Sequence, residues 1–126
     1  MPELDPAQQE RFDAGRDLAR RLLAGAPRDR PLPEEMVRYT MAHLFGDVWQ
    51  GPELELRERS MITCAVLVAL ARENEQRLHF RGARNLGIAR EQLEALITHV
   101  GHYAGWPVAV SALRLLDEVW EQMDAE

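Results

Sequence analysis

A glutamate and a histidine four residues apart, Glu75 and His79, are the pair in this chain whose types and spacing suggest proton-transfer chemistry. At that spacing the two side chains lie one turn apart on the same face of a helix. The carboxylate can then accept a hydrogen bond from one ring nitrogen, which fixes the tautomer and leaves the other nitrogen for proton transfer. On spacing alone, an exposed i,i+4 ion pair is the simpler interpretation.

Two further histidines, His99 and His102, stand three residues apart with Tyr103 beside them. A His-x-x-His pair could bind a metal, but two ligands do not complete a zinc site. The segment Glu75-x-x-x-His79 is also one residue longer than the Glu-x-x-His motif of di-iron bundles. We therefore expect no metal site, and we interpret His99 and His102 as polar residues at the rim of the core.

All 15 basic residues are Arg, and the lack of lysine excludes Schiff-base catalysis, including imine-forming aldolases and pyridoxal enzymes. Guanidinium groups suit carboxylate recognition, because their fork matches the two carboxylate oxygens. Arg59 opens an apolar segment, so we expect it to be buried with an acidic partner. Three arginines that we call the Arg stripe, Arg77, Arg81 and Arg84, are expected to form a solvated face. Their expected acidic partners are Glu73, Glu75 and Glu91.

The chain has one cysteine, Cys64, which excludes an internal disulfide, a CxxC redox pair and a zinc knuckle. Because Cys64 lies inside an apolar segment, we expect a buried core residue of low reactivity. The sequence contains no glycine-rich phosphate loop, nucleophile elbow or HExxH motif. These enzyme classes therefore receive no support.

The 126 residues carry a formal charge of -6 and give a pI near 5.2. This argues against nucleic-acid binding, which needs a basic surface. The longest apolar run, residues 64–71, is too short to span a bilayer, and the N-terminus lacks a signal-peptide pattern. We therefore expect a cytoplasmic protein without membrane partners. A small all-helical chain often covers its apolar surface by pairing with copies of itself.

Helical patterns separated by Gly and Pro run along the chain, with no strand-like alternation. We expect an all-α fold of about six helices in a single domain, residues 1–126, with its core in 34–123. Asp5 and Pro6 suit the start of the first helix, and three prolines within 25–33 indicate a linker between elements. The expected helices cover residues 6–24, 34–45, 56–72, 75–86, 90–104 and 107–123.

The segment 56–72 is the most apolar of these, because every residue from Met61 to Ala71 except Thr63 is apolar or Cys. Such a helix is expected to be covered on most sides. In a chain this small, that cover comes from an enclosing bundle or from a subunit interface.

Five motifs follow one another along the chain. They are Phe45-Gly-Asp-Val-Trp49, Leu54-x-Leu-Arg-x-Arg-Ser60, Glu75-x-x-x-His79, Asn85-x-Gly87 and Tyr103-Ala-Gly-Trp-Pro107-x-Ala109. In this order they resemble the carboxymuconolactone decarboxylase family, within the alkylhydroperoxidase-D-like superfamily. The similarity covers roughly residues 10–122, and the third and fifth motifs are its most specific parts.

The resemblance implies an all-α subunit that assembles into rings, commonly trimers or hexamers, with sites near the subunit contacts. It also implies a reaction without metal or organic cofactor, in the catabolism of aromatic compounds. The peroxidase branch of the superfamily carries a Cys-x-x-Cys-x-x-x-His motif. Aligning its histidine with His79 puts Arg72 and Glu75 at the two cysteine positions, so dithiol peroxidase activity is not expected.

The decarboxylase branch acts on a γ-carboxy butenolide, a lactone acid like 4-carboxymuconolactone. Loss of carbon dioxide leaves a dienolate, so the enzyme must hold the carboxylates, stabilise the oxyanion and deliver one proton. For this chemistry we hypothesise that His79 is the proton donor and Glu75 its orienting partner. Arg59 would hold a substrate carboxylate, and Tyr103 or His102 would line the pocket or donate to the oxyanion. The other expected substrate-binding residues are Trp49 and Trp106.

Two positions depart from the decarboxylase pattern: Gly51 stands where those enzymes carry Arg, and Val110 where they tend to carry Asn. Both changes suggest a less charged or different substrate. A non-catalytic or ligand-binding oligomer of the same fold is therefore an alternative, and a thiol-dependent redox protein that uses Cys64 is a third hypothesis. An accessible His79 that titrates near neutrality would favour the enzyme over the second hypothesis.

Overall fold

The computed structural model describes residues 3–27 and 30–126, and every regular element in these ranges is helical. The expected all-α class is therefore confirmed. Contacts between elements gather in two compact units, the described residues up to Glu55 and the segment Leu56–Glu126. That the whole chain acts as one domain stays a prediction.

The first unit begins with α1 (Pro6–Leu22), which starts at the expected residue and ends at Leu22 rather than at residue 24. The Asp5 carboxylate accepts a hydrogen bond from the Gln8 amide at 2.8 Å, and the Gln8 side chain accepts one from the Asp5 amide at 3.0 Å. This reciprocal cap satisfies two amides that a helix start leaves unpaired. Irregular backbone follows, as expected for the proline-rich stretch 25–33, in which Arg28 and Asp29 lie outside the described residues.

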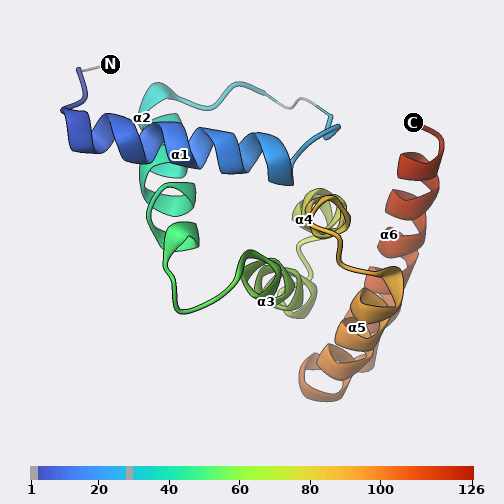
Figure 1. Cartoon of the computed structure of the whole chain (residues 1–126). Helices are drawn as coiled ribbons and strands as arrows, with labels where there is room; N and C mark the ends of the chain where they lie inside the picture. The colour runs from blue at the N-terminus through green and yellow to red at the C-terminus, as the bar shows by residue number, and fades with distance from the viewer. Residues whose placement is uncertain (1–2, 28–29) are drawn as a thin grey trace. The chain divides into compact units, whose positions relative to one another are not determined.

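α2 (Glu34–Arg38) continues without a break into a π-helix, η1 (Tyr39–Phe45), and a short 3₁₀ turn, η2 (Val48–Gln50), comes next. The helix expected over 34–45 therefore has the right bounds, but its second part is wider than an α-helix. Figure 1 shows that α1 crosses this continuous helix.

The crossing depends on two glycines, Gly15 in α1 and Gly46 at the end of η1. A Cβ atom on Gly15 would lie 2.7 Å from the amide nitrogen of Gly46 and 2.7 Å from the carbonyl carbon of Met41. These distances are below any that ordinary packing tolerates, because the obstructing atoms belong to the main chain. The two helices therefore meet backbone to backbone at this point.

The second unit consists of α3 (Leu56–Ala69), α4 (Glu73–Asn85), α5 (Arg90–Ala104) and α6 (Trp106–Asp124). Their shared core is apolar and includes Cys64, Phe80, Ile97 and Leu116. α5 and α6 lie side by side (Figure 1) and are joined at Gly105, whose φ of 114° suits glycine. The expected bounds are close to the observed ones, with the largest difference at the end of α3, Ala69 rather than residue 72.

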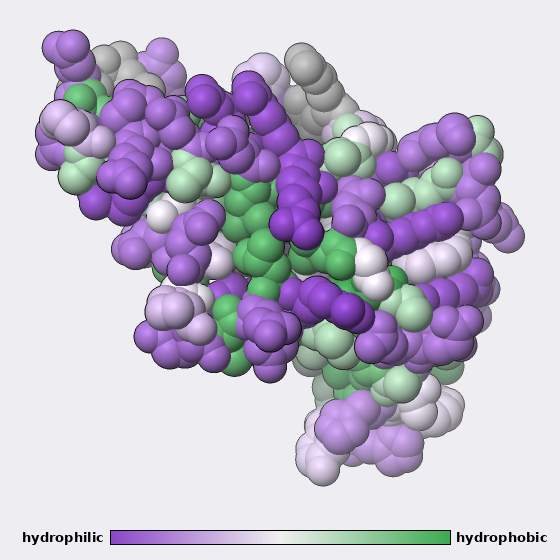
Figure 2. All heavy atoms as spheres, in the orientation of Figure 1, coloured by the Kyte–Doolittle hydropathy of each residue, from purple (hydrophilic) through white to green (hydrophobic). Residues whose placement is uncertain are grey.

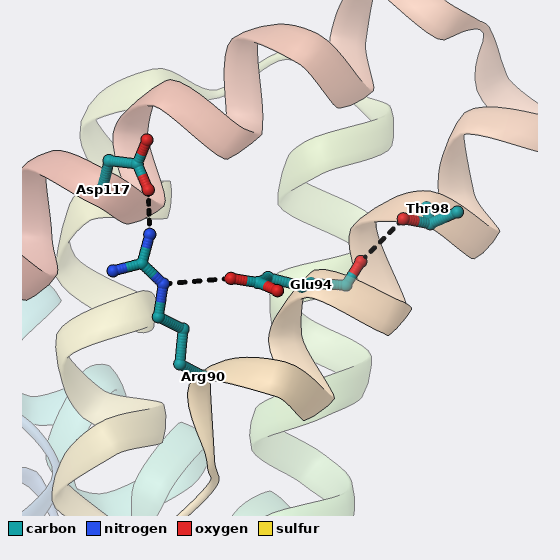
Figure 3. A network of polar contacts seen from close by, with 4 residues as sticks. All are labelled: Arg90, Glu94, Thr98 and Asp117. Carbon is teal, nitrogen blue, oxygen red and sulfur yellow. Dashed lines mark hydrogen bonds and ion pairs between the residues drawn. The ribbon is translucent and has the colours of Figure 1, made fainter.

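Polar contacts tie the start of α5 to α6 (Figure 3). The Arg90 guanidinium donates from Nε to Glu94 Oε1 at 3.0 Å and also forms an ion pair with Asp117 of α6. The Thr98 hydroxyl donates to the Glu94 carbonyl at 2.9 Å, so this side of α5 carries a continuous row of contacts. The contacts with Glu94 and Asp117 hold the Arg90 side chain at the start of α5.

One expectation about α3 is wrong within the chain: the helix is not covered on most sides. Cys64 and Val68 are buried, whereas Ile62 and Val66 are each 49% exposed and Leu70 is 65% exposed. The last three lie on one face at i, i+4 and i+8, because the other helices of the unit pack on the opposite face. Figure 2 shows hydrophobic patches that interrupt a largely hydrophilic surface. An enclosing bundle is therefore absent from the described chain, and the subunit interface stays a prediction.

We predict that Gly15→Ala destabilises the protein by about 1–3 kcal/mol, because the added methyl forces α1 away from η1. Helix propensity alone would have the opposite effect and stabilise the variant by about 0.5–1 kcal/mol. The free energy of unfolding, measured by urea titration with circular dichroism, decides between the two signs. A variant as stable as the wild type, or more stable, would contradict the close crossing.

Candidate functional site

His79 lies in the middle of α4, on the side of the helix that packs against α3. Its main-chain carbonyl accepts a hydrogen bond from the Cys64 thiol of α3 at 3.5 Å. The imidazole is partly buried, and its Nδ1 atom is enclosed without a hydrogen-bond partner among the described residues. A buried ring nitrogen without a partner is uncommon in folded proteins, and a bound water or a functional role can account for it.

Burial lowers the pKa of the His79 imidazole below its usual value of 6.5, while the negative charge of Glu75 acts in the opposite direction. Desolvation is the larger of the two causes. The ring is therefore mainly neutral at pH 7 in the free protein. A neutral imidazole can take up a proton when an anion binds beside it.

Glu75 lies one turn before His79, as the spacing predicts, but its carboxylate pairs with another residue. Its Oε1 atom accepts a hydrogen bond from Arg72 Nη2 at 3.2 Å. The pKa of Glu75 is lowered by a hydrogen bond from its own backbone amide and then by Arg72. No hydrogen bond joins Glu75 to His79 among the described residues. In this state Glu75 acts on His79 through charge, and its orienting role stays a prediction.

Two more buried polar residues lie on α3 and α4, the helix pair that encloses His79. Their spacing in the sequence does not indicate a site. Ser60 is fully buried on α3, and its hydroxyl has no partner among the residues described. Gln76 is 2% exposed; its Nε2 donates to the Leu67 carbonyl at 3.2 Å, and its Oε1 is unpartnered in the described part of the chain. Their residue types could have indicated them, because polar residues at core-facing helix positions are uncommon.

Two hollows of the second unit lie at the start of α4. An open one of about 530 Å³ is lined by the turn between α3 and α4 and includes Arg72 and Glu75. A smaller one of about 140 Å³ is lined by Gln76 together with Pro107 and Ser111 of α6. Neither has His79 among its lining residues.

The predicted residues His102, Tyr103 and Trp106 gather at the corner between α5 and α6. His102 Nδ1 lies 2.8 Å from the Thr98 carbonyl and donates a hydrogen bond to it, which fixes the orientation of the ring. The His102 ring meets Trp106 edge-on with centroids 5.6 Å apart, and Tyr103 stacks on His99 at 5.1 Å. Tyr103 is 84% exposed, so the corner is a surface cluster of aromatic and imidazole rings. Within the part of the chain that the structure describes, no hydrogen bond or ring contact joins this corner to His79.

The other two predicted binding residues lie elsewhere. Arg59 is partly buried on α3, and its carbonyl accepts a hydrogen bond from Thr63 Oγ1 at 2.8 Å. Trp49 belongs to η2 in the first unit and packs its ring on Phe45, with centroids 5.5 Å apart. Trp49 is buried, so in the isolated chain it supports the fold of its unit.

The expectation for the Arg stripe is wrong in its ion-pair partners and, at Arg81, in its exposure. Arg81 is 2% exposed and makes two hydrogen bonds to the Glu126 carboxylate, at 2.9 and 2.7 Å. Arg77 pairs with Glu118 at 2.8 Å. Arg84 pairs with Asp124 at 2.6 Å and also stacks on the Trp120 ring. The partners come from the C-terminal part of the chain because α6 packs on α4, which sequence proximity does not indicate.

Cys64 is buried in the core, as expected. Burial raises the pKa of its thiol to about 12, which keeps the group protonated at neutral pH. The thiolate is the reactive form, so this environment disfavours redox chemistry at Cys64.

Within residues 3–27 and 30–126, no three His, Cys, Asp or Glu side chains come close enough together to hold a metal ion. In the same ranges, no helix has the length and apolar character needed to cross a membrane.

Comparisons with known proteins point to one family. The model of the carboxymuconolactone decarboxylase family matches residues 34–118. A 4-carboxymuconolactone decarboxylase of Acinetobacter baylyi is 40% identical over 79 residues, which cover 63% of this chain and 59% of that protein. A nitrosuccinic acid decarboxylase of Metarhizium robertsii is 32% identical over 69 residues, which cover 55% of this chain and 48% of that protein. The matched region thus spans between about half and three-fifths of these relatives.

We predict that the pKa of His79, followed by the NMR shifts of its ring protons, lies below 6.5 in the free protein. Glu75→Gln should lower that pKa further, because the negative charge that favours the imidazolium is removed. Glu121→Gln removes an exposed carboxylate from α6 and serves as the control, with no change expected. A His79 pKa above 6.5 would show that the ring is not in the described environment. A pKa that is the same in Glu75→Gln as in the wild type would show this too.

Proposed function

The chain belongs to the carboxymuconolactone decarboxylase family, and we propose that it is a decarboxylase of a small lactone acid or related carboxylic acid, working without a cofactor. The names of the two relatives support the reaction type. The observation that carries the proposal is the enclosed, unpartnered Nδ1 atom of His79, in a ring whose pKa is lowered by burial. Such a group can hold and release one proton.

The reaction consumes one proton. The bond between the substrate carbon and its carboxylate breaks, carbon dioxide leaves, and the electron pair remains as a dienolate conjugated with the lactone carbonyl. The anionic substrate raises the pKa of His79 on binding, so that the ring takes up a proton. His79 then donates this proton to the dienolate carbon and returns to the neutral form, which its burial favours.

The remaining assignments belong to the same proposal. Arg59 holds a substrate carboxylate through its guanidinium group, and Glu75 adjusts the proton affinity of His79 through its charge. Trp49, His102, Tyr103 and Trp106 line the binding site, although the last three make no hydrogen bond or ring contact with His79 within the described chain. A site near a subunit contact, where residues from neighbouring chains meet, would reconcile these positions.

Assembly into a homo-oligomer, a trimer or hexamer, is part of this proposal. Its support is the row of Ile62, Val66 and Leu70, which leaves large apolar side chains exposed along α3. Further exposed aromatic residues, Tyr103 and Trp106, lie at the corner of α5 and α6. A cytoplasmic location, expected from the sequence, is included in the proposal.

A non-catalytic, ligand-binding member of the family is the second candidate. Three observations favour it. Gly51 and Val110 replace polar residues of the decarboxylase pattern, and His79 lines neither of the two hollows described at the start of α4. The His79 ring is also partly buried with a lowered pKa, rather than accessible and titrating near neutrality. The same fold often carries different functions, so family membership alone does not decide between the candidates.

We predict that His79→Gln lowers kcat for carbon dioxide release from 4-carboxymuconolactone at least about 100-fold, because general acid catalysis is lost. His43→Gln changes an exposed histidine of the first unit outside the proposed reaction site, so it is the matched control and should retain activity. Circular dichroism checks that both variants keep their helices. Full turnover by His79→Gln would overturn the assignment, and no turnover by the wild type would favour the second candidate.

A second prediction concerns assembly. Val66→Glu puts a charge on the exposed apolar face of α3 and should convert the oligomer to monomers, because a charge buried at an interface without a partner is costly. Ala95→Glu, which adds the same charge at an exposed position of α5, is the control. Sedimentation velocity measures the masses. A monomeric wild type, or an unchanged oligomer in Val66→Glu, would exclude this interface.

A further inference from the structure

A separate hollow of about 220 Å³ lies entirely within the first unit. One wall comes from the start of α1 and the residues just before it, and the other from the end of α2 and from η1. All lining residues fall between Leu4 and Asp47, so the hollow shares none with the proposed site at His79. It has no part in the proposed decarboxylation.

Two guanidinium groups line this hollow, although the chain as a whole is acidic. No hydrogen bond or ion pair engages the Arg11 side chain among the described residues. Arg38 lies over the Tyr39 ring at 5.1 Å and makes a long hydrogen bond of 3.5 Å to its hydroxyl. The hollow therefore offers two positive charges with no carboxylate of the described chain bound to either.

The only carboxylate among the lining residues, Asp47, has a different neighbour. Its Oδ2 atom lies 3.8 Å from Nδ1 of His43, one turn earlier on η1. The two guanidinium groups therefore outnumber the one carboxylate among the lining residues, and Asp47 is paired with neither of them. Guanidinium groups bind carboxylates through paired hydrogen bonds, so an anion with two oxygens suits the site.

The remaining lining residues are suited to the apolar ring of a ligand. Leu4, Ala42 and the Tyr39 side chain contribute apolar surface. A cavity of about 150 Å³ accommodates a benzene molecule, so a hollow of this size has room for one ring and a carboxylate group. The wide turn of η1 separates Tyr39 from His43 along the wall, and such π-helical turns occur frequently at binding sites.

We propose that this hollow binds a single-ring carboxylate, with the carboxylate between Arg11 and Arg38 and the ring against Tyr39. The site is independent of the proposed reaction at His79. A ligand held there contacts α1 and η1 together and thereby stabilises the crossing of these two helices.

Benzoate is the probe for this site, in an NMR titration of the ¹⁵N-labelled full chain. The amide signals of Ala42 and His43 should shift in a saturable way. Arg11→Gln and Arg38→Gln should each weaken benzoate binding about tenfold, because each removes one charged hydrogen-bond donor. Benzamide, which has the same ring without the charge, should bind at least about tenfold more weakly than benzoate.

Two controls separate this site from the one at His79. Arg20→Gln removes an exposed arginine of α1 outside the hollow and should leave binding unchanged. His79→Gln should abolish turnover under the proposed function yet leave the Ala42 and His43 shifts intact. The inference is wrong if benzoate does not shift these signals, if neither arginine variant weakens binding, or if benzamide binds as tightly as benzoate.

Discussion

Two hydrogen bonds from buried side chains to main-chain carbonyls determine how α4 lies on α3. Cys64 donates to the carbonyl of His79, and Gln76 donates to the carbonyl of Leu67. Sliding one helix along the other would leave these donors buried without acceptors, at a cost of about 1–3 kcal/mol for the Gln76 amide and less for the weakly donating Cys64 thiol. The same register puts the unpartnered polar atoms of Ser60, Gln76 and His79 in the interior of the unit. The proton-transfer chemistry proposed for His79 therefore depends on this helix pair.

Charge pairing holds the other side of α4. The C-terminal part of the chain is rich in carboxylates, which are unfavourable near the negative end of a helix dipole. The Arg stripe offsets them, and Arg81 does so from a buried position with two parallel hydrogen bonds. A lysine has no planar fork, so it could not replace Arg81 with the same geometry. The use of Arg in place of Lys in this chain thus suits the paired hydrogen bonds that join α4 to the C-terminal residues.

Much of the fold could be predicted because Gly and Pro mark helix ends through purely local effects. Gly105 and Pro107, for example, locate the α5–α6 corner within one residue. Features that depend on tertiary contacts could not be predicted: the widening of η1 accompanies the crossing at Gly15, and the partners of Arg81 arrive only when α6 packs on α4. In the candidate site, spacing indicated that Glu75 and His79 share a helix face. It could not indicate that Arg72 engages the carboxylate or that burial lowers the pKa of the imidazole.

The π-helix η1 also restricts how this segment can change length in evolution. A π-helical turn corresponds to an α-helix with one residue inserted, and each residue of an α-helix rotates the next part of the chain by about 100°. Loss of one residue between Tyr39 and Phe45 would let the helix close into the α form. Phe45 and Trp49 would then leave their buried positions, and Gly46 would no longer meet Gly15. Substitutions on the outer face of this helix are therefore more easily accepted than single-residue deletions within it.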